Sequence, residues 1–157
     1  MRARAAVVSI GLLAGLSMTV VSASAQSTNP RHGAWKLKSD APAPASNIMT
    51  YEPYQGTGMR ITIESVNARG EKSQWGYMTL FDGKDEPLYG NPNTDTGAVI
   101  QISDRINEII YKKNNVVTQI LTNVLSPDGK TIGVLYMRMD ATGQRVTNIS
   151  VATYEKL

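Results

Sequence analysis

The sequence of 157 residues predicts an all-β domain, built as an antiparallel up-and-down meander that closes into a β-barrel of about eight strands. Three observations predict this fold. Apolar and polar residues alternate with period two through most of the chain after residue 33. Glycine-containing turns separate these runs at short spacing, and no segment has a well-supported helical pattern. A meander leaves two exposed edges unless it closes, so we expect a barrel, with a two-sheet sandwich as the alternative.

Residues 1–25 have the features of a secretory signal peptide. Two arginines near the start precede an apolar stretch over residues 5–21, and residues 23–25 (Ala-Ser-Ala) form a small-residue cleavage site. A transmembrane anchor is the alternative for residues 5–21, but this stretch is shorter than the roughly 20 apolar residues that usually span a bilayer. We therefore expect cleavage after Ala25, a secreted or periplasmic protein, and no membrane span in the mature chain.

The mature chain is expected to consist of a leader and one domain. Residues 26–32 are polar, include the only histidine, His32, and are expected to be flexible. Residues 33–157 are long enough for one domain with its own core. Without the two arginines of the signal peptide, 14 basic side chains are balanced by 13 acidic ones. This balance does not predict a nucleic-acid partner, because nucleic-acid binding requires a basic stripe.

The alternation and the turns define ten candidate segments, of which we expect some to merge or fail, leaving eight or nine strands. In the first half, residues 42–44 contain two prolines and mark an extended link. Met59, Ile61 and Ile63 then alternate with polar residues, and the aromatic residues of 74–82 share one face. The segments are 33–38, 46–54, 58–67, 74–82, 86–89, 97–103, 105–112, 115–125, 131–140 and 145–155.

The second half of the domain is divided by turns that contain glycine or asparagine. Residues 113–115 (Lys-Asn-Asn) predict a tight turn, because asparagine tolerates the left-handed region. Residues 126–130 and 141–144 each contain a glycine of the kind that a bulged hairpin needs. Residues 115–125 carry apolar side chains on both faces, which indicates either a homo-oligomer interface or scattered surface valine and leucine.

The inward-facing rows predict the wall of a small-molecule site. Tyr77, Met59, Ile61, Leu135 and Met137 are the predicted ligand-lining residues, since tyrosine hydroxyls orient a ligand and methionine adapts to an apolar one. For any one aromatic residue, core packing is favoured over ligand contact, because tyrosine-rich strands also fill barrels. We expect a non-enzymatic binding module for a small, mostly apolar molecule. The alternative is a module that binds another protein, or itself, through its outer strand faces.

Catalytic and metal chemistry have few candidate residues in this sequence. There is no cysteine and only one histidine, which leaves no basis for thiol chemistry, most zinc sites or a histidine-based triad. We therefore predict no catalytic residue, no cofactor and no metal site. Asp82, Asp85, Glu86 and Asp95 gather in residues 82–96, where calcium binding and turn hydrogen bonds are the two interpretations.

Two groups of residues resemble known proteins. Gly33-Ala34-Trp35 resembles the G-x-W signature of lipocalins, which implies structural roles for Gly33 and Trp35, with Trp35 packed across one barrel end. A late arginine that stacks on the tryptophan would be Arg138 or Arg145. The motif D-G-K-D-x-P-x-x-G-N-P-x-x-D-T in residues 82–96 resembles a group of small secreted bacterial proteins of unknown function. That resemblance implies a lipocalin-like domain and no particular activity.

Overall fold

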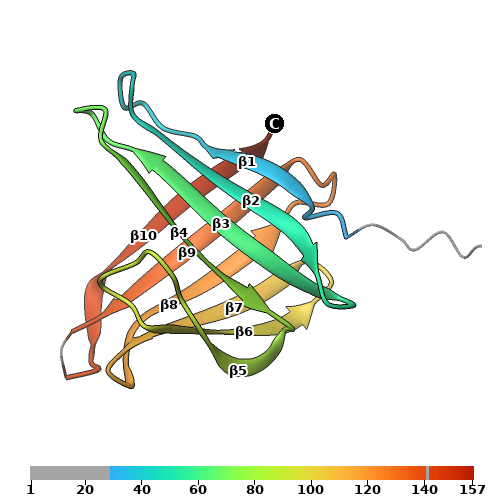
Figure 1. The fold of residues 1–157 in the computed structure, drawn as a ribbon, viewed down its shortest axis with the longest axis vertical. Coiled ribbons are helices and arrows are strands. Elements are labelled where there is room, and N and C mark those ends of the chain that lie inside the picture. Colours follow the sequence, from blue (N-terminus) through green and yellow to red (C-terminus); the bar gives the residue numbers. More distant parts are fainter. Residues whose placement is uncertain (1–28, 141) are drawn as a thin grey trace, which may run out of the picture.

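Within residues 29–140 and 142–157, which the computed structural model describes, ten antiparallel strands form one sheet that curves into a nearly closed barrel (Figure 1). The predicted signal peptide, residues 1–25, lies outside the described residues. No helix long and apolar enough to cross a membrane occurs in the described part of the chain. The strands are β1 (Gly33–Leu37), β2 (Ser46–Tyr54), β3 (Gly58–Val66), β4 (Lys72–Thr79), β5 (Asp82–Pro87), β6 (Thr96–Ser103), β7 (Ile106–Lys113), β8 (Val116–Leu125), β9 (Thr131–Met139) and β10 (Arg145–Lys156).

The meander closes through its first and last strands. Trp35 lies opposite Lys156 and Leu37 lies opposite Tyr154, so β1 and β10 pair side by side (Figure 1). Every other pair of neighbours in the sheet consists of strands that are consecutive in the chain. The predicted all-β antiparallel meander is therefore confirmed. The described residues contain ten strands rather than about eight, because none of the candidate segments merges with its neighbour.

The fifth strand lies earlier in the chain than the alternation predicts. The segment predicted at 86–89 forms at Asp82–Pro87, and β4 ends at Thr79 instead of continuing to residue 82. The sequence of β5, Asp-Gly-Lys-Asp-Glu-Pro, consists of residues that are depleted in strands. It adopts a strand because it pairs with β6, where Asp85 lies opposite Ala98. In β5, the pairing with β6 therefore outweighs the low intrinsic strand propensity of its residues.

The two sheet edges, β4 and β5, meet at a seam. Among the described residues one isolated bridge crosses it: the amides of Gly76 and Tyr89 each donate to the other residue's carbonyl at 3.0 Å. The Tyr89 hydroxyl lies 3.3 Å from the Thr62 hydroxyl oxygen. A Cβ atom at position 76 would collide with the Ile61 carbonyl oxygen and with the Tyr89 ring. The missing side chain of Gly76 thus allows the segment after β5 to cover the seam.

We expect Gly76→Ala to lower the free energy of unfolding by about 1–3 kcal/mol, because an added methyl group overpacks the seam. Chemical denaturation followed by tryptophan fluorescence measures this loss. Gly133→Ala is the matched control, since Gly133 also lies within a strand but a Cβ atom there meets no heavy atom within 4 Å. Equal stability of the two variants would contradict a role for Gly76 in closing the seam.

Candidate functional site

One end of the barrel is closed by the chain segment just before β1. Trp35 is fully buried, and its indole Nε1 donates a hydrogen bond to the Arg31 carbonyl oxygen at 2.8 Å. The Lys156 ammonium lies 5.1 Å from the Trp35 ring centre and donates to the Pro30 carbonyl oxygen at 2.9 Å. Residues 30–31 and Lys156 therefore form a plug over Trp35.

The plug differs from the sequence-based expectation in two respects. Residues 26–28 of the predicted flexible leader, 26–32, lie outside the described residues, whereas Arg31 in the same segment is 1% exposed and is held inside the barrel end. The cation over Trp35 is Lys156 rather than Arg138 or Arg145. The physical reason is register, because the pairing of β1 with β10 places Lys156 directly opposite Trp35.

The buried Arg31 side chain begins a chain of hydrogen bonds. Its Nη1 donates to Asn123 Oδ1, and its Nη2 donates to the Arg105 carbonyl oxygen at 2.7 Å. Asn123 Nδ2 in turn donates to the Tyr51 hydroxyl at 3.1 Å. Within the described residues no ion pair joins Arg31 to a carboxylate. Burial lowers the pKa of Arg31 below its usual range, and the nearby Tyr51 partly offsets this effect.

A cavity of about 170 Å³ lies inside the barrel, and Tyr51 and Asn123 form part of its wall. The wall combines aliphatic side chains with tyrosine hydroxyls and side-chain amides. None of the described lining residues is acidic or basic. The lining residues are Asn47, Met49, Tyr51, Ile61, Ile63, Trp75, Tyr77, Ile109, Tyr111, Gln119, Leu121, Asn123, Val134, Tyr136 and Tyr154.

Five tyrosines among these residues supply most of the polar groups. The rings of Trp75, Tyr77 and Tyr111 contact one another at centre-to-centre distances of 5.8–6.4 Å, and the Tyr111 hydroxyl donates to that of Tyr77 at 3.4 Å. Burial raises the pKa of all five tyrosines, to about 12 for Tyr51, because a phenolate would be desolvated. The wall therefore presents neutral hydroxyl groups at neutral pH.

One polar atom of the wall lacks a partner. Asn47 donates from Nδ2 to the Ser65 hydroxyl oxygen at 2.7 Å, whereas its Oδ1 is buried and has no hydrogen-bond partner among the described residues. Leaving a buried acceptor unsatisfied costs about 1–3 kcal/mol. A donor group on a molecule bound in the cavity would satisfy this atom.

The structure brings only part of the predicted ligand-lining set together. Tyr77 and Ile61 face the cavity. Met59 is fully buried but lies outside the cavity lining, within the core. Its inward orientation follows the alternation of β3, so the pattern identifies its face but not its place along the barrel.

The orientation of β9 is opposite to the predicted one. The alternation of β9 predicts that Leu135 and Met137 line the cavity. The cavity is instead lined by Val134 and Tyr136, which alternate with them along the strand. Leu135 and Met137 are half-buried on the outer face. Because β9 carries apolar residues on both faces, alternation alone does not determine which face is inside.

Sequence patterns did not identify the polar residues of the wall. Asn123 is 3% exposed and interrupts a β-branched run between Thr122 and Val124. An amide is disfavoured in a strand, so its position in the middle of β8 is a local signal for a buried polar network. Arg31 gives no such signal, since its buried partners are distant in sequence.

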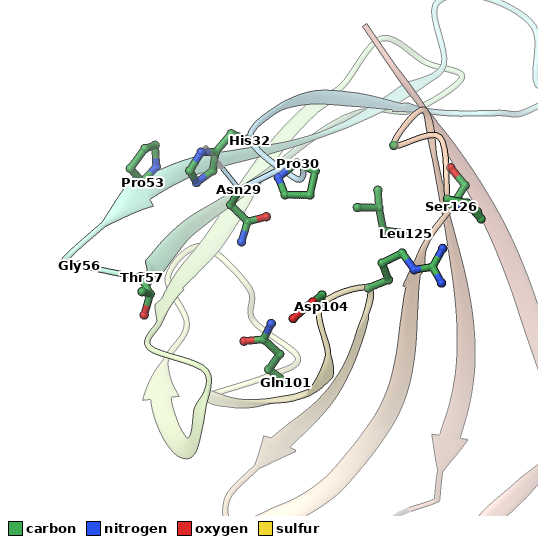
Figure 2. Close-up of a pocket in the computed structure, with 14 residues that line it drawn as sticks. Asn29, Pro30, His32, Pro53, Gly56, Thr57, Gln101, Asp104, Leu125 and Ser126 are labelled. Atoms are coloured by element: carbon green, nitrogen blue, oxygen red, sulfur yellow. The ribbon is translucent and has the colours of Figure 1, made fainter. Parts of the chain in front are cut away.

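A larger hollow of about 640 Å³ lies against the plug and is bordered by turns (Figure 2). Figure 2 shows Asn29, Pro30 and His32 on one side of this hollow, with His32 beside Pro53, and Leu125 and Ser126 on the other side. Its walls come mainly from the turns β2–β3, β6–β7 and β8–β9. Nowhere in the described chain do three or more histidine, aspartate or glutamate side chains gather as metal ligands. His32 and Asp104 both border this hollow, but among the described residues no hydrogen bond or ion pair joins them, so we assign the candidate site to the interior cavity.

Three carboxylates of residues 82–96, those of Asp82, Asp85 and Asp95, contact lysines, and two of them also accept from backbone amides. Asp95 also accepts a hydrogen bond from the Asn114 amide at 2.7 Å, and this bond together with Lys113 lowers the pKa of Asp95. Three of the four acidic residues therefore make the turn and strand contacts of one of the two interpretations. The pairs are Asp82–Lys84 at 2.5 Å, Asp85–Lys112 at 2.7 Å and Asp95–Lys113 at 2.7 Å.

No family model, no curated protein and no solved structure matches this chain. The resemblance to lipocalin-like secreted proteins therefore stays a prediction. Any functional conclusion depends on the chemistry of the cavity itself.

Proposed function

We propose that this protein is a secreted or periplasmic, non-enzymatic binding module that holds one small, mostly apolar molecule inside the barrel. The observation that carries the proposal is the interior cavity of about 170 Å³ with a buried, unpartnered acceptor, Asn47 Oδ1, in its wall. An apolar protein cavity of about 150 Å³ accommodates benzene, so this cavity suits a molecule with a single ring. The signal-peptide features of residues 1–25 support export.

The chemistry of the lining supports binding rather than catalysis. Its polar groups are neutral tyrosine hydroxyls and amides, none of which pairs a nucleophile with a general base. The aliphatic side chains Ile61, Ile63, Ile109 and Leu121 supply apolar contact area. A few fixed polar groups in a mainly apolar wall are typical of small-molecule sites.

Native mass spectrometry of protein purified from the cells that make it tests the proposal. We expect a small-molecule adduct that dissociates when the protein is denatured. A thermal-shift screen against lipids and hydrophobic metabolites provides the second measurement. A monomer without an adduct and without a thermal shift for any compound would refute the proposed function.

Val134→Phe is expected to remove the adduct, because a larger side chain fills the cavity from its β9 wall. Val134 is 3% exposed and lines the cavity. Leu135→Phe is the matched control, since the neighbouring residue lies on the outer face of the same strand. We expect at least a tenfold loss of adduct in the first variant and no loss in the second, measured on proteins with equal unfolding temperatures. An adduct that persists in Val134→Phe would place the ligand elsewhere.

A second candidate function, self-association, is favoured by an apolar strip on the outer barrel face. Ile149, Met137, Ile120 and Ile110 lie opposite one another across four neighbouring strands, β10 to β7. Val151, adjacent on β10, is 73% exposed. The same native mass spectra distinguish the two functions: a dimer without an adduct would favour self-association over ligand binding.

A further inference from the structure

Arg31 places a positive charge beside the cavity without a compensating negative one. Its side chain is 1% exposed and is held by an amide oxygen and a backbone carbonyl oxygen. Within the described residues no carboxylate pairs with it, and the cavity lining contains none. Buried charges in proteins are normally paired, because transfer out of water is costly. This uncompensated charge favours an anion inside the neighbouring cavity, where the hydrogen bonds from Arg31 through Asn123 lead to Tyr51.

Asn123 and Tyr51 connect this charge to the cavity. Asn123 accepts from Arg31 through Oδ1 and donates from Nδ2 to the Tyr51 hydroxyl oxygen. The Tyr51 hydroxyl proton is directed at Met49 Sδ at 3.2 Å. A thioether sulfur is a weak acceptor, so this polarised O–H group is available to a better acceptor. Since Tyr51 and Met49 both line the cavity, that acceptor would belong to the bound molecule.

A buried acceptor that needs a hydrogen-bond donor lies on the same strand as Tyr51, which offers a donor. Asn47 precedes Tyr51 by four residues on β2, which corresponds to about 14 Å between their Cα atoms. Its unpartnered Oδ1 calls for a donor, whereas Tyr51 offers one. A molecule that satisfies both has an acceptor oxygen at one end and a hydroxyl or amine at the other. The aromatic wall between them, with Trp75 and Tyr77, suits a ring.

We propose that the cavity selects a small aromatic acid, a single ring whose anionic oxygen accepts from the Tyr51 hydroxyl and whose donor group reaches Asn47 Oδ1. The inference rests on the proposed function, because it names the ligand class of the same cavity. Arg31 acts through Asn123 and Tyr51 as a positioning residue and does not touch the ligand. Charge-assisted hydrogen bonds are roughly twice as strong as neutral ones, so the acid is preferred over a neutral molecule of the same shape.

Isothermal titration calorimetry with para-hydroxybenzoate and the neutral para-hydroxybenzamide tests the charge preference. We expect the acid to bind at least about tenfold more tightly than the amide, the difference of about 1.4 kcal/mol that one charged hydrogen bond supplies. Benzoate, which lacks the hydroxyl group, tests the Asn47 end and is expected to bind about fivefold more weakly than para-hydroxybenzoate, the effect of one neutral hydrogen bond.

Three variants test the path from Arg31 to the ligand. Tyr51→Phe keeps the ring but removes the hydroxyl, and Arg31→Met removes the charge. Both are expected to reduce the preference for acid over amide to within about threefold. Tyr54→Phe, which removes a hydroxyl from the same strand, β2, but outside the cavity lining, is expected to keep the full preference. If Arg31→Met does not fold, Tyr51→Phe alone decides.

The outcomes separate this inference from the proposed function. An acid preference that disappears in Tyr51→Phe and persists in Tyr54→Phe supports the assignment. Equal binding of acid and amide, or a preference that survives in Tyr51→Phe, overturns it. Benzoate binding as tightly as para-hydroxybenzoate overturns the role of Asn47. A native adduct with no acid preference refutes only the ligand class, whereas no adduct and no binding of any probe refutes both proposals.

Discussion

Trp35→Ala lowers the free energy of unfolding by about 3–5 kcal/mol, the range expected when a large, fully buried aromatic side chain is truncated. Trp35 is 0% exposed and connects the plug to the sheet through the Arg31 carbonyl oxygen and Lys156. Its loss removes core packing and also leaves Arg31 less firmly held. Equilibrium urea unfolding, followed by circular dichroism, measures the change. An unfolding curve like that of the parent protein would show that Trp35 is not a structural residue.

Trp35→Phe separates the packing contribution from the hydrogen bond. Phenylalanine keeps most of the aromatic contact area but cannot donate to the Arg31 carbonyl oxygen. We expect this variant to lose about 1–2 kcal/mol, a value between the parent and Trp35→Ala. A loss as large as that of Trp35→Ala would mean that the hydrogen bond to the plug, rather than packing, dominates.

Raising the pH above about 10 is expected to unfold the protein, because the pKa values of the five cavity tyrosines are raised by burial. In the unfolded chain these phenols lose their protons near pH 10, whereas the folded chain retains them, so stability falls as the pH rises. Each group lowers the free energy of unfolding by about 1.4 kcal/mol per pH unit, for Tyr51 until its pKa of about 12 is reached. The losses of the five groups add, and domain stability is usually only 5–15 kcal/mol, so their combined loss is large enough to unfold the protein.

Urea unfolding midpoints measured at increasing pH test this expectation. The full stability contribution is present below about pH 10 and is lost above it. Tyr51→Phe is the control, because removing one phenol flattens the decline by about 1.4 kcal/mol per pH unit. Tyrosinate absorbance that corresponds to more than two of the seven tyrosines, while the β-sheet circular dichroism signal stays constant, would contradict the burial of these five hydroxyl groups.

The strands could be predicted from sequence where alternation is clear and turns bound it. The predicted segment 46–54 coincides with β2, and 131–140 extends one residue beyond β9. In contrast, β5 consists of turn-forming residues and becomes a strand only through its pairing with β6. Period-two patterns report which residues of a segment are buried. They therefore cannot predict a strand, such as β5, that forms only because it pairs with a neighbouring strand.

The site was less predictable because its contacts are distant in sequence. Arg31 and Asn123 are 92 residues apart, and no local pattern links a polar leader to the middle of β8. On β9 the apolar residues of both faces made Leu135 and Val134 equal candidates for the interior. Tyr77 and Ile61 were assigned to the cavity because their strands have one clearly apolar face.

The pairing of β1 with β10 has a consequence for how the chain acquires its fold. Trp35 and Lys156 face each other across 121 residues (156 − 35), so this contact closes nearly the longest loop that the described chain can make. Non-local pairing of this kind slows folding, because the entropy of loop closure is lost before the contact stabilises the product. During synthesis or export, β1 stays unpaired on this side until β10 becomes available. Until then the growing sheet has two unpaired edges, which makes the unfinished chain vulnerable to aggregation.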